Sequence, residues 1–366
     1  MICPQNSPWF TRALGVILFL QSGIREDERS GSTIDLEGHM KFLKPRFEFD
    51  SRVNPYFPHQ VLMESTSACQ LRCIMCARTK ALKKGTLKVG HMEEWLALKI
   101  MHEIAVVNPK TRLWFCYFGE PTISKRVWSR IRIAKDKGIE KTILNSNGNL
   151  LRPAMCEQAI ESGLDEIYIG LDAATPETYA RVRVKGDFRK VVRNIYYLLE
   201  HKKENLKVTV QFGVYEENEH ELETFKKYWT DLGVPIFVRP KLTWLGYLPE
   251  HHPTNETRYP CPWILDSLPI YYDGSVPYCI CDWDNRMSAG DVKTQTLTEI
   301  WQGTCRRWQN RHLAGRFQEL PDFCQQCRDW QVKPLQGTLE KLYDTRLTFD
   351  DVVMSKPDCL KTKDFF

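Results

Sequence analysis

From residue 59 to residue 240 the chain alternates short apolar runs with longer amphipathic segments. The run HQVLMES at 59–65 is apolar and then turns polar, as a buried strand that leads into a loop does. The segment MEEWLALKIMHEIAVV at 92–107 repeats apolar residues three and four positions apart, which is typical of a helix packed on one face. Strands and helices that alternate in this way form a parallel sheet with helices outside it.

The alternation predicts six strands, which are too few for a closed eight-stranded barrel. We therefore predict an α/β fold, an open, partial (βα)6 barrel, in which ligands bind at the carboxyl ends of the strands. The predicted strands are 59–65, 112–118, 141–146, 165–171, 206–214 and 235–240, and the predicted helices are 92–107, 124–138, 152–163, 175–182, 188–203 and 219–233.

After residue 245 prolines become frequent, which indicates a domain boundary. Residues 268–279 are expected to form a hairpin around the turn Asp273-Gly274. Residues 296–313 are expected to form a helix, because Thr296 and Glu299 match a capping box at its start. The predicted organisation is an N-terminal extension (1–58), a barrel (59–245), a small second domain of hairpin and helix (246–330) and a C-terminal tail (331–366).

The extension contains one apolar run, ALGVILFL at 13–20, which resembles a signal-peptide core and is too short to span a bilayer. We expect residues 1–39 to contribute nothing to the chemistry, because Met40 is a plausible alternative first residue of the protein. The formal net charge of +5 is small for 366 residues, and the basic residues are dispersed. Neither nucleic acid nor a membrane is expected as a partner, and a cytoplasmic location is expected.

Three cysteines follow the first predicted strand: Cys69, Cys73 and Cys76, spaced Cys-x3-Cys-x2-Cys. Disulfides need pairs, and a structural zinc site takes four ligands. A [4Fe–4S] cluster held by three thiolates keeps one iron open for a small molecule. The alternative is a three-thiolate zinc site with a distant fourth ligand.

This spacing after a first strand resembles the radical S-adenosylmethionine (radical SAM) superfamily. The resemblance implies that SAM chelates the open iron and is cleaved to a 5′-deoxyadenosyl radical, which removes hydrogen from an unactivated C–H bond. The motifs FGEP (118–121), NSNGN (145–149) and IGLDAATPETYARVR (169–183) match further family segments in the same order. By that resemblance, the residues expected around SAM are Met75, Gly119, Glu120, Ser146, Asn147 and Arg183.

Four more cysteines, Cys261, Cys279, Cys324 and Cys327, are spaced Cys-x17-Cys-x44-Cys-x2-Cys. Four thiolates suit zinc or a fully ligated iron–sulfur cluster, and the spacing alone favours zinc. The surrounding pattern resembles the SPASM/twitch extension of radical SAM enzymes, and implies one auxiliary [4Fe–4S] cluster. It is similar to 2-deoxy-scyllo-inosamine dehydrogenase and to related sugar and aminoglycoside epimerases.

Cys281 lies two residues after Cys279, and is a candidate hydrogen-atom donor to a substrate radical. The alternatives are a loop thiol or a replacement ligand. Asp282 and Asp284 are weaker candidates for proton transfer or substrate binding, since most loop carboxylates are solvated.

The resemblance implies an oxidoreductase that acts on a small polyhydroxylated molecule, such as a sugar, cyclitol or antibiotic intermediate, by dehydrogenation or epimerisation. Flavodoxin or ferredoxin is the expected electron donor, because no reducing domain is evident. The alternatives are a maturase of a ribosomal peptide and a non-enzymatic zinc protein.

Overall fold

The computed structural model describes residues 54, 56–86, 88–248 and 258–331. All of them belong to one compact unit, Leu43–Phe366. The expectations for residues 1–39 and for the tail after residue 331 therefore lie outside the described residues.

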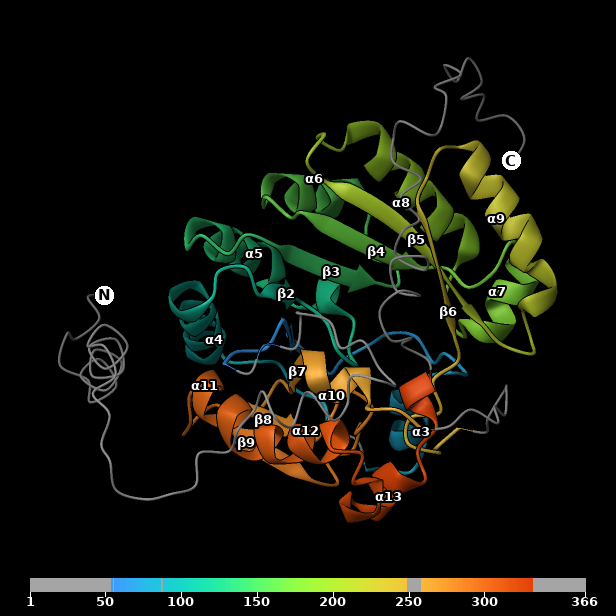
Figure 1. Ribbon diagram of the computed structural model, residues 1–366. Coiled ribbons are helices and arrows are strands. Elements are labelled where there is room, and N and C mark those ends of the chain that lie inside the picture. Colours follow the sequence, from blue (N-terminus) through green and yellow to red (C-terminus); the bar gives the residue numbers. More distant parts are fainter. Residues whose placement is uncertain (1–53, 55, 87, 249–257, 332–366) are drawn as a thin grey trace, which may run out of the picture. The chain divides into compact units, whose positions relative to one another are not determined.

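The main sheet is parallel and has seven strands in the order β6-β5-β4-β3-β2-β1-β7 (Figure 1). The six predicted strands form its first six members, and β7 is an addition. The edge strands β6 and β7 are not hydrogen-bonded to each other, so the barrel is open as predicted. The strands are β1 Gln60–Met63, β2 Arg112–Trp114, β3 Thr142–Ser146, β4 Glu166–Gly170, β5 Lys207–Val214, β6 Ile236–Pro240 and β7 Ser267–Ile270.

Helices between the strands cover the outer face of this sheet (Figure 1). In α8 the side chain of Asp187 caps the first turn by accepting from the Lys190 amide, and Val191, Ile195 and Leu198 form the buried stripe. The outer side chains of β5, such as Phe212, pack against α8 and α9 in the main core. The helices are α4 Glu94–Val107, α5 Val127–Asp136, α6 Pro153–Glu161, α7 Pro176–Val182, α8 Phe188–His201 and α9 Leu222–Asp231.

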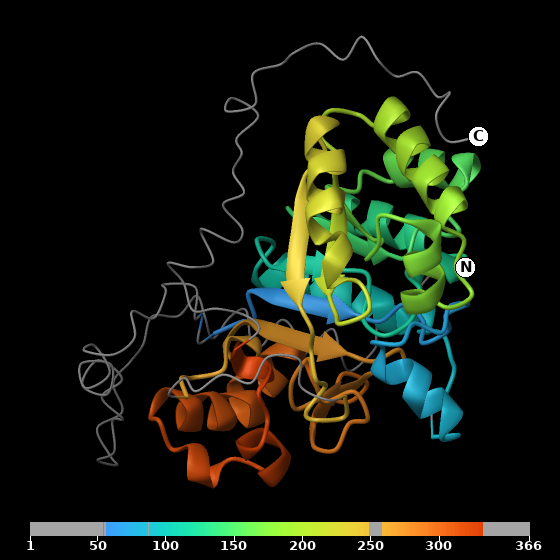
Figure 2. The ribbon, with the colours of Figure 1, turned by 90° about the vertical axis from the view of Figure 1, so that its right-hand side faces the viewer.

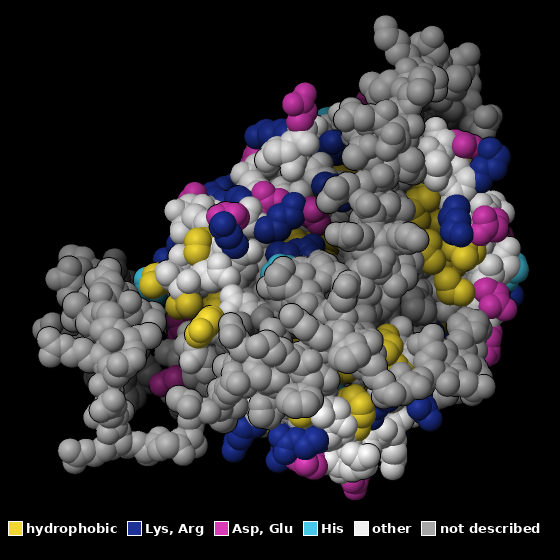
Figure 3. Space-filling view, viewed as in Figure 1, with side chains coloured by type: hydrophobic (Ala, Val, Ile, Leu, Met, Phe, Trp, Pro, Cys, Tyr) yellow, Lys and Arg dark blue, Asp and Glu magenta, His cyan; other side chains and the backbone are white. Residues whose placement is uncertain are grey.

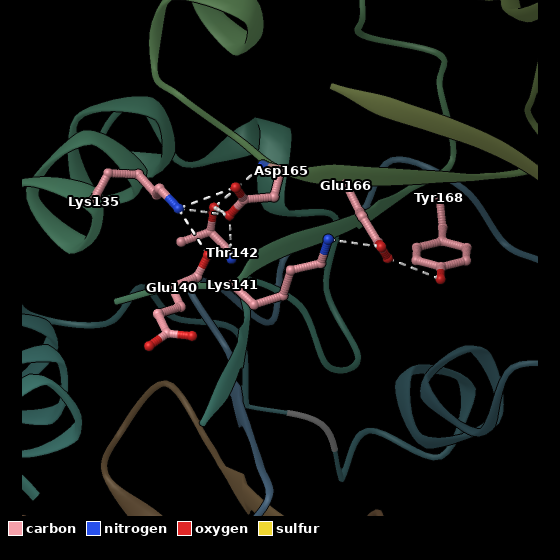
Figure 4. Close-up of polar contacts among 7 residues, drawn as sticks. All are labelled: Lys135, Glu140, Lys141, Thr142, Asp165, Glu166 and Tyr168. Atoms are coloured by element: carbon pink, nitrogen blue, oxygen red, sulfur yellow. Dashed lines mark hydrogen bonds and ion pairs between the residues drawn. The ribbon is translucent and has the colours of Figure 1, made fainter. Parts of the chain in front are cut away.

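Polar side chains tie the amino ends of β3 and β4 together (Figure 4). The carboxylate of Asp165 accepts from Lys135 Nζ at 2.9 Å and from the amide and hydroxyl of Thr142 at 2.7 and 2.8 Å. Lys141 pairs with Glu166 at 2.8 Å, and Glu166 also accepts from the Tyr168 hydroxyl. These contacts fix strand register at the edge opposite the carboxyl ends, where ligands of such folds bind.

The C-terminal part departs from the predicted hairpin. Residues 268–270 lie in β7, which pairs in parallel with β1 and so extends the main sheet (Figure 2). A hairpin does form here, but it joins β8 (Ser275–Pro277) to β9 (Ser288–Asp291). Parallel pairing of β7 with a strand about 200 residues earlier has no local sequence signal.

The predicted helix at 296–313 is present in three segments. It consists of α11 (Leu297–Ile300), a π-helical turn (Trp301–Cys305) and α12 (Arg306–Leu313). Thr296 and Glu299 form both bonds of the predicted capping box. Two short helices lie beside predicted ligands: α10 (Pro262–Asp266) directly follows Cys261, and α13 (Asp322–Gln325) contains Cys324.

On the face drawn in Figure 3, basic and acidic side chains are interspersed over the described surface. None of the described helices is long and apolar enough to cross a bilayer.

Candidate active site and cluster-binding residues

The first three cysteines lie on one loop between β1 and α3 (Ala77–Lys83), and Cys76 is the residue before this helix. All three are free thiols. Burial is the main cause that raises the pKa of Cys69 to about 11 and that of Cys73 to about 12, and the neighbouring Cys76 thiol is a smaller contribution to both. Thiols with such pKa values are protonated at neutral pH, so that ligation of iron would release their protons.

The loop is held on both sides by backbone contacts. The amide of Arg72 donates to the carbonyl of Val184 at 2.8 Å, which joins the loop to the end of α7. On the other side the amide of Glu120 donates to the carbonyl of Ala68 at 2.7 Å. A side chain on Gly119 would collide with the carbonyl of Thr66 and would also lie too close to that of Ala68. Glycine is therefore required at residue 119, because the chain passes so close to the segment that leads into the cysteine loop. The contact of Gly119 with SAM stays a prediction.

Glu120 is buried and accepts from four protein donors. Its Oε1 accepts from the amide and hydroxyl of Thr122, at 3.2 and 2.5 Å, and from the Ser146 hydroxyl at 2.8 Å. Its Oε2 accepts from the Asn147 amide at 2.8 Å. Burial raises the pKa of Glu120, and these donors oppose the shift. The carboxylate thus orients the end of β3, and Oε2 keeps one lone pair for a further donor.

Ser146 and Asn147 differ in the partners of their side-chain hydrogen bonds. The Ser146 hydroxyl donates to Glu120 and accepts from the Gly148 amide at 3.0 Å, so both its functions are used within the protein. The Asn147 side chain donates through Nδ2 to the sulfur of Cys69 at 3.8 Å and accepts from Gln70 at 3.0 Å. Asn147 is therefore the member of this pair that contacts the cysteine loop.

Arg183 lies beside the same loop and forms a buried ion pair. Its Nη2 and Nε contact the Asp172 carboxylate at 2.6 and 2.8 Å. The guanidinium occupies the space over Gly170, which explains why this strand position has no side chain. Its charge lowers the pKa of Cys73, against the larger effect of burial. The carboxylate that Arg183 contacts in the structure is that of Asp172, and its contact with SAM stays a prediction.

Met75 is buried in the small apolar cluster that surrounds the cysteine loop, together with Leu71, Val182 and Tyr215. Its carbonyl accepts from the indole of Trp244 at 3.0 Å. The Trp244 ring in turn lies 5.2 Å from that of Phe118.

The second group of cysteines surrounds one cavity. Cys261 precedes α10, Cys279 follows β8, and Cys324 and Cys327 lie in and after α13. All four line the cavity, together with Cys281, His312 and Asp329. Four thiols around a single space are the donor set of a [4Fe–4S] cluster. No three His, Cys, Asp or Glu side chains among the described residues are placed to hold a single metal ion.

Polar groups converge on one of these sulfurs. The sulfur of Cys324 lies 3.4 Å from Arg258 Nη2, 3.7 Å from the Tyr278 hydroxyl and 3.7 Å from His312 Nε2. Nδ1 of His312 accepts from the Cys261 amide, so the ring proton is on Nε2, which faces Cys324. Burial lowers the pKa of His312 to about 3, which keeps the ring neutral.

Cys281 is fully buried and lines the same cavity as the four predicted ligands. A hydrogen bond with Cys279 and burial raise its pKa well above the usual value. Asp282 accepts from the backbone amides of Tyr278, Arg286 and Met287, and so shapes the loop that carries Cys279. Asp284 pairs with Arg286 near the surface.

Residues 243–245 connect the two cysteine groups, and sequence reasoning missed them. The Asp329 carboxylate, two residues after Cys327, accepts from the amides of Thr243 and Leu245 at 2.6 and 2.9 Å. Between them the Trp244 indole donates to the Met75 carbonyl, next to Cys76. Trp244 and Leu245 both have positive φ, an uncommon backbone conformation for residues other than glycine. We call this segment the 243–245 bridge.

Asp172 was also missed. It is fully buried, and it binds Arg183 through Oδ2 and the Gly213 amide through Oδ1, at 2.6 Å. Its place directly after a predicted strand was a usable signal, because side chains at that point face the ligand end of the sheet.

Comparison with known proteins agrees with this architecture. The family model described as "Radical SAM superfamily" matches residues 63–228, and that described as "Iron-sulfur cluster-binding domain" (SPASM) matches residues 261–328. The tungsten-containing aldehyde ferredoxin oxidoreductase cofactor-modifying protein of Pyrococcus furiosus is 28% identical over 218 residues, which are 58% of this chain and 55% of that protein. The chain thus spans about half the length of this curated relative.

Solved structures share the fold. BtrN in complex with AdoMet and 2-DOIA has a TM-score of 0.54 at 17% identity, over 76% of this chain and 96% of BtrN. Streptococcus suis SuiB bound to the precursor peptide SuiA has a TM-score of 0.56 at 12% identity, over 88% and 83%. The matched families bind SAM and [4Fe–4S] clusters, and both cysteine groups fit that role. The chain therefore contains a radical SAM superfamily domain, residues 63–228, followed by a SPASM-type iron–sulfur cluster-binding domain, residues 261–328.

Proposed function

We propose that the chain is a radical SAM oxidoreductase that attacks a carbinol or similar C–H bond of a small polyhydroxylated molecule. A sugar, cyclitol or antibiotic intermediate fits this description, and the outcome is dehydrogenation or epimerisation. The 243–245 bridge carries the proposal, because it holds the two cysteine groups in one assembly. An enzyme that removes one hydrogen atom and then one electron needs two redox centres near one substrate.

When bound, SAM and its cluster supply a 5′-deoxyadenosyl radical, and the auxiliary cluster supplies an acceptor for a second electron. Cys69, Cys73 and Cys76 would hold the first cluster, and Cys261, Cys279, Cys324 and Cys327 the second. Around SAM, Arg183 would bind the carboxylate, the free lone pair of Glu120 would accept from the ammonium, and Met75 would pack near the adenine. Flavodoxin or ferredoxin would deliver the electron from outside.

Iron analysis of anaerobically reconstituted protein tests the two sites. About eight irons per chain are expected for two [4Fe–4S] clusters. Cys73→Ala should retain about four irons, in the C-terminal site, and Cys279→Ala should retain about four, in the N-terminal site. Only Cys73→Ala should abolish formation of 5′-deoxyadenosine with dithionite and SAM. Zinc without iron in the parent protein would contradict the proposal and favour the zinc alternative.

The product separates the two reaction types. A product two mass units lighter than the substrate indicates dehydrogenation. A product of unchanged mass in water that carries one deuteron on carbon when formed in D2O indicates epimerisation. Cys281→Ala tests the donor role predicted for epimerisation. If this variant epimerises at the parent rate, Cys281 is not the donor. Turnover of a peptide but of no small polyol would instead support the maturase alternative.

A further inference from the structure

The inner face of β5 carries polar side chains that nothing in the described protein satisfies. Val208, Val210 and Phe212 point outward into the helix-packed core. Because side chains alternate along a strand, Thr209 and Gln211 face the inside of the open barrel. They are only 4% and 3% exposed, yet Thr209 Oγ1 and Gln211 Oε1 have no hydrogen-bond partner.

A third unsatisfied group lies on the neighbouring strand. In the register of β5 and β6, Gln211 is opposite Phe237, and Gly213 is opposite Arg239. Nε of Arg239 is buried and also lacks a hydrogen-bond partner. A buried polar group without a partner destabilises the folded chain, so three such groups on neighbouring strand positions indicate a place for a ligand.

The space beside these three groups is positively charged, as a comparison of the two nearby arginines indicates. Arg183 is neutralised by Asp172, whereas Arg239 forms no ion pair with any described residue. Arg239 lies near Tyr215, whose pKa is raised chiefly by burial and lowered in turn by the charge of Arg239. Tyr215 packs with Cys73 in the apolar cluster around the cysteine loop. The uncompensated cation is therefore next to the residues that surround the SAM-binding thiols.

We propose that Arg239, Gln211 and Thr209 form the substrate subsite, and that the substrate is a polyhydroxylated molecule bearing a carboxylate or phosphate. Arg239 binds the anionic group, because a guanidinium matches the geometry of both anions. The Gln211 carbonyl oxygen accepts from a substrate hydroxyl, and Thr209 bonds to another. This assignment rests on the proposed function, since it names the substrate class of the same site.

Calorimetry of the anaerobically reconstituted protein in the presence of SAM tests the assignment. The probes are glucose, glucose 6-phosphate and glucuronate, which present one ring with no anion, a phosphate or a carboxylate. The parent should bind at least one of the two anionic sugars about tenfold or more tightly than glucose. That ratio should fall to about one in Arg239→Gln, while the affinity for SAM stays within about twofold.

The control is Arg112→Gln, which removes a half-buried arginine at the amino end of β2, where it packs over Trp114. It should keep the preference for the anionic sugar. Gln211→Leu should weaken binding of the anionic sugar but not of inorganic phosphate.

The assignment is overturned if the parent does not discriminate among the sugars or if Arg239→Gln retains the preference. Loss of SAM affinity in Arg239→Gln would also overturn it, by placing this residue at the cofactor. Binding does not require SAM cleavage. A protein that prefers the anionic sugar but forms no 5′-deoxyadenosine would contradict the proposed function alone.

Discussion

The guanidinium of Arg183 lies over Gly170, in the space that a side chain on residue 170 would occupy. Gly170→Ala should therefore displace Arg183 from Asp172 and weaken SAM binding about tenfold, equivalent to about 1.4 kcal/mol. Calorimetry with SAM on the reconstituted protein measures this. Gly303→Ala is the matched control, because a methyl group there meets nothing within 4 Å. Unchanged SAM affinity in Gly170→Ala would show that Arg183 does not bind the cofactor.

The ion pair between Asp172 and Arg183 should matter far more for stability than a surface pair. Asp172 is fully buried, and Asp172→Asn leaves the guanidinium without its counter-charge, which typically costs about 3–5 kcal/mol. The exposed pair Lys227–Asp231 provides the comparison, and Asp231→Asn should cost less than about 1 kcal/mol. Unfolding in guanidinium chloride under anaerobic conditions gives the free energy of unfolding of both variants. Similar small losses in the two variants would mean that the buried pair adds little.

Stability should depend on the titration of Glu64. Burial raises the pKa of this carboxyl to about 7, although it accepts from the amides of Phe118 and Tyr272. In the unfolded chain the group ionises near its usual value of 4.5. As pH rises from 4.5 towards 7 the unfolded state loses its proton first, so this group makes unfolding progressively easier.

Between pH 5 and 7.5 the parent should lose about 2 kcal/mol more unfolding free energy than Glu64→Gln, which cannot ionise. Glu223→Gln, at an exposed residue, should follow the parent. Chemical denaturation at the two pH values checks this. Identical pH slopes for the parent and Glu64→Gln would rule out the raised pKa.

The reduction potential of the auxiliary cluster should depend on Tyr278. Its hydroxyl donates to the sulfur of Cys324, and donors to a ligating sulfur favour the reduced, more negative cluster. Tyr278→Phe should therefore lower that potential, as followed by the electron paramagnetic resonance signal during a redox titration. Tyr117→Phe is the control, because this hydroxyl donates to the Ile280 carbonyl and to no sulfur. A shift of equal size in both variants would assign the effect to general loss of packing.

The first six strands could be predicted because each combines an apolar run with an adjacent amphipathic helix. β7 could not, since residues 267–270 contain Pro269 and join the sheet only by pairing with β1, far away in the sequence. Local composition around Asp273-Gly274 favoured a hairpin between 268 and 279, whereas the strand β8 pairs forward with β9.

The candidate site, like the fold, could be predicted only in part. Cysteine spacing indicated both sets of thiols, because ligand chemistry limits which residues can take part. The four donors to Glu120 and the pairing of Arg183 with Asp172 depend on which strand ends meet in space. The sequence carries no periodicity for such contacts, so Asp172 and Asp329 were found only in the structure.

The 243–245 bridge has a consequence for how the protein matures. Asp329 follows Cys327 closely, so a Cys327 without its metal would also loosen the carboxylate that holds Thr243 and Leu245. The hydrogen bond from the Trp244 indole to the Met75 carbonyl, next to Cys76, would then weaken. A filled C-terminal site should accordingly slow the loss of iron from the N-terminal one, although the N-terminal site can fill without it.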